Sequence, residues 1–325
     1  MNTGYEQYIP DGGRKMGRGI EILQTVLPVI IVIVIGMIIR RSGLIGRNGI
    51  NAIKSLVVNI TLPALLLSAF ATTTYSARDI LIPLAMFAVC LAAWFLGKYV
   101  GRLLRMDSPF VPFLTTGFEA GMLGYALFTM LYGSGRTAEF AILDLGQVLF
   151  VFTVYKVLLD RDTKGKTDGR KLLKEMVLSP IIIAIAAGVL IGATGLYQLL
   201  VPSGISGIFD ACTDFVGGPT SMCILLTIGY DLVFSDVPWK ETMKAVVLRL
   251  AIMAVLGAAF IGFLKLVFPD VDLTSAAIVM FLLPPPFVLP VFADDEKQRA
   301  YLSSVLSIYT LVSILGFALL AVLGV

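Results

Sequence analysis

Glu119 is the residue whose type and position most suggest chemistry, because it is a carboxylate near the centre of a long apolar run. An ionised acid at the middle of a membrane helix costs about 2.5–3.5 kcal/mol on insertion scales, so it should be paired, hydrated or protonated. Burial favours the uncharged form of a carboxyl group, which suits a proton carrier at neutral pH. The alternatives are that Glu119 coordinates sodium together with carbonyl oxygens, or donates one structural hydrogen bond when protonated.

Four further polar residues lie in apolar runs. Asp144 and Gln147 are three residues apart and therefore share one helix face; they either couple an ion or satisfy the local backbone. Asn59 stands four residues before Pro63, so its amide either contacts a substrate or bonds a carbonyl that the proline leaves free. Arg249 either snorkels to the membrane surface or faces inward as the partner of a substrate carboxylate.

The stretch from Phe281 to Phe292 cannot be one continuous helix. Its three consecutive prolines lack backbone N–H groups, and each pushes the preceding residue out of the α region. We expect two half-helices that meet near mid-membrane, where broken helices hold substrate in transporters; the alternative is a buried kink without a ligand. A helix restarting at Phe287 would offer N–H groups to an anion. The expected substrate-binding positions are Pro284, Pro285, Pro286, Phe287 and Val288, together with Gly121 and Gly124.

The composition defines a membrane protein with many spans. Apolar residues make up 58% of the 325 residues, charged residues 14%, and the mean hydropathy is +0.91. Soluble domains carry about 25% charged residues. The chain has no histidine, which excludes a histidine proton relay or triad, and we predict no catalytic residue. We also expect no nucleic-acid partner and no cofactor other than a coupling proton or sodium ion.

The apolar runs predict an all-α protein of ten transmembrane helices. A tail (1–19) precedes two five-span halves, 20–159 and 176–325, which are separated by a basic loop, 160–175. The expected spans are Ile20–Ile39, Gly49–Ala71, Asp79–Leu103, Pro109–Tyr132, Thr137–Leu159, Met176–Leu200, Ile205–Val233, Thr242–Phe268, Leu273–Ala293 and Gln298–Val322.

The distribution of Lys and Arg orients the spans. Most of them, including Arg40, Lys98 and Lys244, fall on one side, which should be cytoplasmic. We expect the protein in the cell (inner) membrane, with both termini on its outer, extracellular or periplasmic side. Because five is an odd number, the two halves must have opposite topology, as inverted repeats. Spans 2 and 7 and spans 4 and 9 are irregular at matching positions, and we expect spans 4 and 9 to cross where each is broken.

Several of these segments resemble one known family. Asn59-Ile-Thr-Leu-Pro-Ala-Leu-Leu-Leu67 resembles the Leu-Pro-Ala segment of the auxin efflux carrier family, which includes plant PIN carriers and bacterial malate or malonate permease-like proteins. Phe118-Glu-Ala-Gly-Met-Leu-Gly124 is similar to its crossover motif, and Asp144-Leu-Gly-Gln147 is similar to the polar motif of its fifth span. The resemblance covers the chain from the first to the tenth span.

The resemblance implies the ten-span fold of bile-acid sodium symporters. In that fold, spans 1, 2, 6 and 7 form a scaffold that is often dimeric, and spans 3–5 and 8–10 form a transport domain that moves like an elevator. This chain departs from the family pattern at two residues of span 4, where Glu119 replaces an asparagine and Ala126 replaces a proline. In span 9, the sequence Pro284-Pro-Pro-Phe-Val-Leu289 lacks the family asparagine.

We therefore predict a homodimeric secondary transporter of small organic anions, coupled to protons or sodium through Glu119, Asp144 and Gln147. A channel or receptor on the same scaffold is the alternative. An intramembrane aspartyl protease is a remote one, because Tyr230-Asp231 has no second aspartate in a Gly-x-Gly-Asp setting. The chain also lacks a Gly-rich nucleotide-binding loop, which disfavours ATP-driven pumping.

Overall fold

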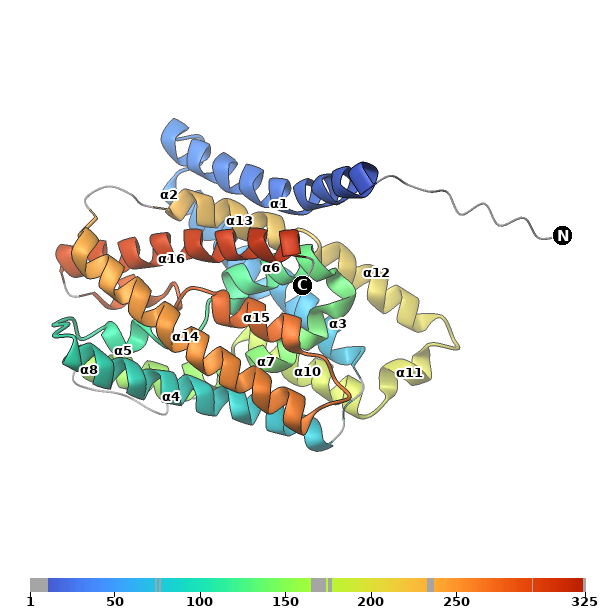
Figure 1. Cartoon of the computed structure of the whole chain (residues 1–325). Coiled ribbons are helices and arrows are strands. Elements are labelled where there is room, and N and C mark those ends of the chain that lie inside the picture. The colour runs from blue at the N-terminus through green and yellow to red at the C-terminus, as the bar shows by residue number, and fades with distance from the viewer. Residues whose placement is uncertain are drawn as a thin grey trace.

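The structure is a computed structural model that describes residues 11–73, 75, 77–164, 174, 177–232, 237–293 and 295–323. All regular elements in these ranges are helical (Figure 1). They are α1 (Asp11–Ser42), α2 (Arg47–Leu56), η1 (Val57–Thr61), α3 (Leu62–Ala71), η2 (Ala77–Ile80), α4 (Leu81–Leu103), α5 (Val111–Leu114), η3 (Ala120–Gly124), α6 (Tyr125–Tyr132), η4 (Ser134–Arg136), α7 (Thr137–Phe150), η5 (Val151–Tyr155), α8 (Lys156–Lys164), α10 (Pro180–Ala193), α11 (Leu196–Leu200), α12 (Ile205–Gly217), α13 (Thr220–Asp231), α14 (Trp239–Val267), α15 (Thr274–Leu282), η6 (Leu289–Phe292) and α16 (Glu296–Leu323).

Six helical stretches among the described residues are long and apolar enough to cross a membrane. They are Arg47–Ala71, Arg78–Leu103, Ser134–Leu159, Ile205–Asp231, Trp239–Val267 and Glu296–Leu323. The apolar helix α10 is shorter. This confirms an all-helical membrane protein, because apolar runs of this length match the thickness of the bilayer.

The ends of two predicted segments differ from the structure. Helix α1 begins at Asp11, inside the stretch predicted as a tail. The first span is predicted from its apolar run, and this signal does not detect the polar residues that extend the same helix toward the N-terminus. Helix α8 continues to Lys164 into the predicted basic loop. Most of the remaining loop lies outside the described residues.

Four of the predicted spans are interrupted. Short turns divide Met176–Leu200 into α10 and α11, and Ile205–Val233 into α12 and α13. The two longer interruptions lie in Pro109–Tyr132 and Leu273–Ala293. In the first, α5 ends at Leu114, and η3 and α6 follow the break. Gly117 lies in the break with φ +66°, a conformation that glycine adopts without steric cost. In the second, α15 ends at Leu282, and Leu283 is extended with ψ 151°, as expected for a residue before proline.

The segment after the prolines is not the half-helix that the sequence predicted. It is a single 3₁₀ turn, η6, of four residues. The turn ends at Ala293, whose backbone is extended with φ −73° and ψ 130°. The prediction that the positive end of a helix dipole lies at Phe287 is therefore wrong.

Three π-helical turns occur in the described helices: η1, η3 and η5. Such turns are rare and often lie at functional sites. Pro63 is the second residue of α3, which follows η1, and because it cannot donate a backbone hydrogen bond, it removes one α-helical bond next to this turn.

The helices pack in pairs through close glycine contacts. Helix α1 packs on α13 and helix α10 packs on α3, and a Cβ on Gly36 or Gly188 would collide with the partner backbone. Small residues commonly allow such close approach in membranes. Helix α4 also packs on α5 and α7, and α14 packs on α15 and α16. Figure 1 shows α6, α7 and α15 in the middle of the bundle.

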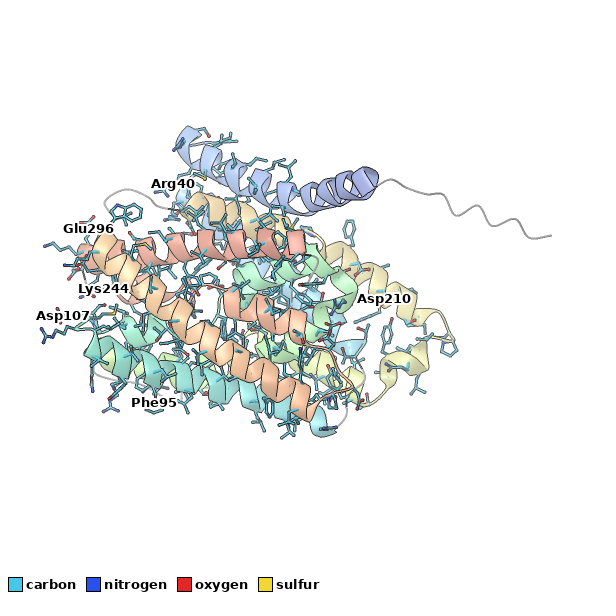
Figure 2. The ribbon with its side chains drawn as sticks, viewed as in Figure 1. Arg40, Phe95, Asp107, Asp210, Lys244 and Glu296 are labelled. Atoms are coloured by element: carbon cyan, nitrogen blue, oxygen red, sulfur yellow. The ribbon has the colours of Figure 1, made fainter. Side chains whose placement is uncertain are left out.

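The outer surface has the character expected of a protein in a bilayer. Large apolar side chains such as Phe95 and Phe215 are exposed, at 57% and 87%. Figure 2 shows Arg40, Lys244 and Glu296 near one end of the bundle and Asp210 toward the other, with Phe95 on the side between them. Charged ends and apolar sides match a membrane-spanning orientation along the bundle.

Candidate functional site

The two segments with the longer interruptions bind each other through Glu119. The backbone N–H of Glu119 donates to the Pro284 carbonyl at 2.9 Å. In return, the Phe287 N–H donates to Glu119 Oε2 at 2.6 Å. The rings of Phe118 and Phe281 also meet edge to face, with centroids 5.4 Å apart. Backbone groups freed by each interruption are thus satisfied by the other, as a membrane interior requires.

Arg249 lies behind this contact and is fully buried, at 0% exposure. Its guanidinium donates to the carbonyls of Leu114 at 3.0 Å, Thr116 at 3.4 Å and Gly117 at 2.7 Å, all in the first interruption. It also donates to the Leu283 carbonyl at 2.9 Å in the second. Arg249 therefore faces inward, and its two terminal nitrogens donate to the protein backbone, while its buried Nε has no hydrogen-bond partner among the described residues.

A second polar network connects α7 to the first interruption. Gln147 Nε2 donates to Asp144 Oδ1 at 2.9 Å, and the Tyr125 hydroxyl donates to Asp144 Oδ2 at 2.9 Å. Gln147 Oε1 accepts the Phe118 N–H at 3.4 Å. Asp144 and Gln147 are buried, at 3% and 6% exposure. A helix spacing of three residues brings the two side chains together, as predicted.

A cavity of about 460 Å³ opens in front of these groups. Its volume is within the range of small-molecule sites. The polar residues that line it are Glu119, Tyr125, Asp144, Gln147, Tyr155 and Lys156. The apolar lining comprises Val58, Leu62, Leu66, Phe118, Gly121, Val148, Val151, Leu159, Ile181, Pro286, Phe287, Val288 and Phe292.

All three π-helical turns of the described chain border this cavity. Val58 belongs to η1, Gly121 to η3, and Val151 and Tyr155 to η5. A π turn places one extra residue in the helical turn, so the facing side chains are displaced from ordinary α-helical register. The local backbone therefore shapes the cavity from three sides.

The structure brings most of the predicted site residues to this cavity. Glu119, Asp144, Gln147, Gly121, Pro286, Phe287 and Val288 all line it. Gly124 instead packs against Phe140 and Leu283. Pro284, Pro285 and Arg249 are buried and are not among the described lining residues.

Asn59 lies away from the cavity. Its side chain is exposed, and its amide donates to the Ser55 carbonyl on its own helix at 2.8 Å. The amide thus bonds a carbonyl four residues earlier in the chain. This is not the bond considered for it, because Pro63 leaves the carbonyl of Asn59 itself, and not that of Ser55, without an α-helical donor.

Sequence reasoning missed three polar residues of the cavity: Tyr125, Tyr155 and Lys156. Tyr125 directly follows the crossover-like motif and could have been found from that position. Tyr155 and Lys156 lie at the end of an apolar run, where a tyrosine and a lysine ordinarily mark the membrane interface. Tyr155 ends the π turn η5 and Lys156 follows it. This turn, which could not be predicted from the sequence, directs both side chains toward the cavity.

A smaller cavity of about 270 Å³ lies on the other side of Phe287. It is lined by Arg47, Asn51, Lys54, Ile228, Asp231, Leu232, Phe287, Pro290, Ser303, Leu306, Ser307 and Thr310. Asp231 pairs there with both Arg47 and Lys54. This places Asp231 at the charged end of the bundle, in an ion pair.

A multi-span helical bundle with interrupted segments around a central cavity defines a membrane transport protein. A sequence profile of the family "Membrane transport protein" matches residues 21–321, and the chain belongs to this auxin-efflux-carrier-like family. An uncharacterized transporter of Methanothermobacter thermautotrophicus is 24% identical over 65% of this chain and 68% of its own length. An uncharacterized transporter of Methanocaldococcus jannaschii is 21% identical over the same shares.

Proposed function

We propose that this protein is a secondary transporter that binds a small organic anion in the 460 Å³ cavity and couples its movement to protons through Glu119. The observation that carries the proposal is the position of Glu119. Its carboxylate lines the cavity and also accepts one of the hydrogen bonds that join the two interruptions. A change in the protonation of Glu119 would therefore alter both the charge that faces the substrate and the hydrogen bond between the two interrupted segments.

The pairing of helices supports ten spans arranged as two inverted repeats. Exchanging spans 1–5 with spans 6–10 turns the α1–α13 contact into the α10–α3 contact. The same exchange turns the α4–α5 contact into the α14–α15 contact. Inverted repeats that place broken helices at a central site are common in secondary transporters. Both termini then lie on the outer side of the membrane, as the charge distribution favours.

The cavity lies between the two groups of spans that the family resemblance separates. Leu62 and Leu66 come from the proposed scaffold, and so does Ile181. Glu119, Asp144 and Phe287 come from the proposed transport domain. A site on this boundary would be carried across the membrane if the transport domain slid along a dimeric scaffold, which is the elevator movement we propose.

The lining favours a substrate with a sizeable apolar part. Apolar side chains cover most of the cavity, and one basic residue, Lys156, is among the described lining residues. An ionised Glu119 would repel an anion, so the anion must bind together with a proton on Glu119. The Phe287 N–H can donate to either protonation state of the carboxyl group. The hydrogen bond between the two interrupted segments is therefore kept when Glu119 gains or loses its proton.

The two carboxylates in the cavity support a second candidate substrate, an amphipathic organic cation. Two acidic residues, Glu119 and Asp144, line the cavity, compared with one basic residue, Lys156, among the described lining residues. In that case, the cation and the proton would compete for Glu119, and the protein would exchange one for the other. A channel on the same scaffold is distinguished from both carriers by its much higher rate.

The test is substrate-induced charge movement and flux in proteoliposomes at two pH values, with and without sodium. Aromatic and aliphatic monocarboxylates, dicarboxylates and amphipathic amines would be compared. We expect saturable, pH-dependent uptake of a monocarboxylate with an apolar body. Uptake of amines alone would contradict the organic-anion proposal and support the organic-cation candidate. The absence of any response would contradict the transporter proposal for these substrate classes.

A further inference from the structure

The cluster of carbonyls around Arg249 has the chemistry of a cation site. Four backbone oxygens from Leu114, Thr116, Gly117 and Leu283 lie 2.7–3.4 Å from its two terminal nitrogens. Leu114 ends the short helix α5 and is followed by Thr116 and Gly117, while Leu283 directly follows α15. The carboxyl end of α15 adds the negative end of a helix dipole to these oxygens. Unwound carbonyls and half-helix carboxyl ends coordinate sodium in broken-helix transporters.

The guanidinium is held by carbonyls and aromatic rings rather than by an acid. Its central carbon lies 5.6 Å from the ring centroid of Phe118 and 5.1 Å from that of Tyr309, within the range of cation–π attraction. The ion pairs of Arg47 and Lys54 with Asp231 and of Arg136 with Glu139 lie elsewhere in the described chain, and Arg249 takes part in none of them. A fully buried charge of this kind is stable only where its surroundings supply the compensating negative potential.

We propose that Arg249 is a tethered cation that takes the place of a coupling sodium ion at the crossing of the two interrupted segments. A sodium ion would enter and leave these carbonyls during each transport cycle. Arg249 is part of α14, so its guanidinium remains among these carbonyls throughout the transport cycle. The two interrupted segments are therefore held together without sodium. Resting on the proposed transport function, this assigns ion coupling to a proton on Glu119 and leaves the carbonyl cluster sodium-independent.

The first test uses the thermal stability of purified protein in detergent, without substrate. In the parent, Tm should be the same in sodium and in choline chloride. Arg249→Ala removes the guanidinium but leaves the four carbonyls, so its Tm in choline should fall by roughly 10 °C. Added guanidinium or sodium should then restore a large part of the loss in a saturable manner, because either cation can occupy the vacated cluster.

Arg47→Ala is the matched control, because Arg47 pairs with Asp231 at the exposed end of the bundle. Its Tm should not respond to guanidinium or sodium beyond the response of the parent. A folded Arg249→Ala protein that no small cation stabilises would overturn the proposal. So would an equal response of the Arg47→Ala control, because the effect would then be unspecific.

Two further measurements keep the proposal testable if Arg249→Ala fails to fold. Arg249→Lys keeps the charge and should retain more stability than the neutral Arg249→Gln. A stabilisation of the parent by sodium over choline would contradict the tethered cation whatever the variants do. Because none of these readouts uses a substrate, a failure of the transport proposal would not be confused with a failure here.

Discussion

Phe287 and Glu119 lie 168 residues apart, and the Phe287 backbone N–H donates to the Glu119 carboxylate at 2.6 Å. The N–H is available because the prolines before it end the helix, and the acid is available because the break in the first segment turns it toward the second. The N–H that the sequence offered to an external anion is thus occupied by the protein's own carboxylate. An anionic substrate must therefore bind beside this pair.

The hydrogen bond from Tyr125 to Asp144 should contribute measurably to stability. Tyr125→Phe leaves a buried carboxylate oxygen without its donor, which we expect to cost about 1–3 kcal/mol. The measurement is Tm in detergent, with Tyr99→Phe at an exposed position as the control. If the two groups act as a pair, Asp144→Asn should cost less in the Tyr125→Phe background than in the parent. Equal costs would show that they do not interact.

Gly121 should set the width of the cavity. Its nearest neighbour is Leu62 Cδ2, 3.5 Å from the position of an added Cβ, so Gly121→Ala fits and Gly121→Leu fills the space. We expect Gly121→Leu to weaken substrate binding about tenfold, or ~1.4 kcal/mol, with little change in Tm. Gly207→Leu, at a helical glycine with open space around it, is the matched control. Unchanged transport by Gly121→Leu would place the substrate elsewhere.

Gly117 should be required both for its backbone conformation and for its contact with Pro286. It has φ +66°, and an added Cβ would lie 3.0 Å from Pro286 Cγ. Gly43 has nearly the same φ, +68°, but no neighbour within 4 Å. Gly43→Ala should therefore cost about 1–2 kcal/mol from strain alone, and Gly117→Ala should cost more. Equal losses in Tm would mean that the contact with Pro286 is easily relieved.

Asp272 should stabilise the start of α15 in a pH-dependent manner. Its carboxylate accepts the Thr274 N–H at 3.0 Å, and its hydrogen bonds with the side chain and backbone of Thr274 lower the pKa of Asp272 below the ordinary 3.8. Because the folded pKa is the lower one, the stabilisation is present above pH 3.8 and is lost as the pH falls through the folded value. The Tm difference between the parent and Asp272→Ala should therefore disappear at low pH. Asp270→Ala serves as the control, and a difference that persists at low pH would contradict the assignment.

The sequence was most informative where single residues impose local rules. The prolines from Pro284 to Pro286 predicted the break in the second segment, because a missing donor acts locally. Glu119 predicted a polar centre, because an acid in an apolar run must find partners. The spacing of Asp144 and Gln147 predicted their shared face, and both line the cavity with Glu119.

Tertiary contacts decided what the sequence could not. An arginine two turns inside an apolar helix can face the surface or the interior. Partners far away in the sequence, such as the carbonyls of Leu114 and Leu283, favour the inward direction of Arg249. Asn59 was equally ambiguous, and its bond to Ser55 leaves it outside the cavity. The π turns around the cavity add one residue to a helical turn, and apolar periodicity does not reveal them.

The most direct test of the account is the proton movement that accompanies substrate uptake, measured with a pH-sensitive dye in proteoliposomes loaded with one transported anion. The parent should take up protons together with the anion, in a fixed ratio and independently of sodium. Glu119→Gln keeps an oxygen that can accept the Phe287 N–H, so it should fold normally but lose proton uptake and the pH dependence of flux. Glu139→Gln, at an acid paired with Arg136 outside the cavity, should behave like the parent. Undiminished, pH-dependent proton uptake by Glu119→Gln would contradict the central claim that coupling occurs at Glu119.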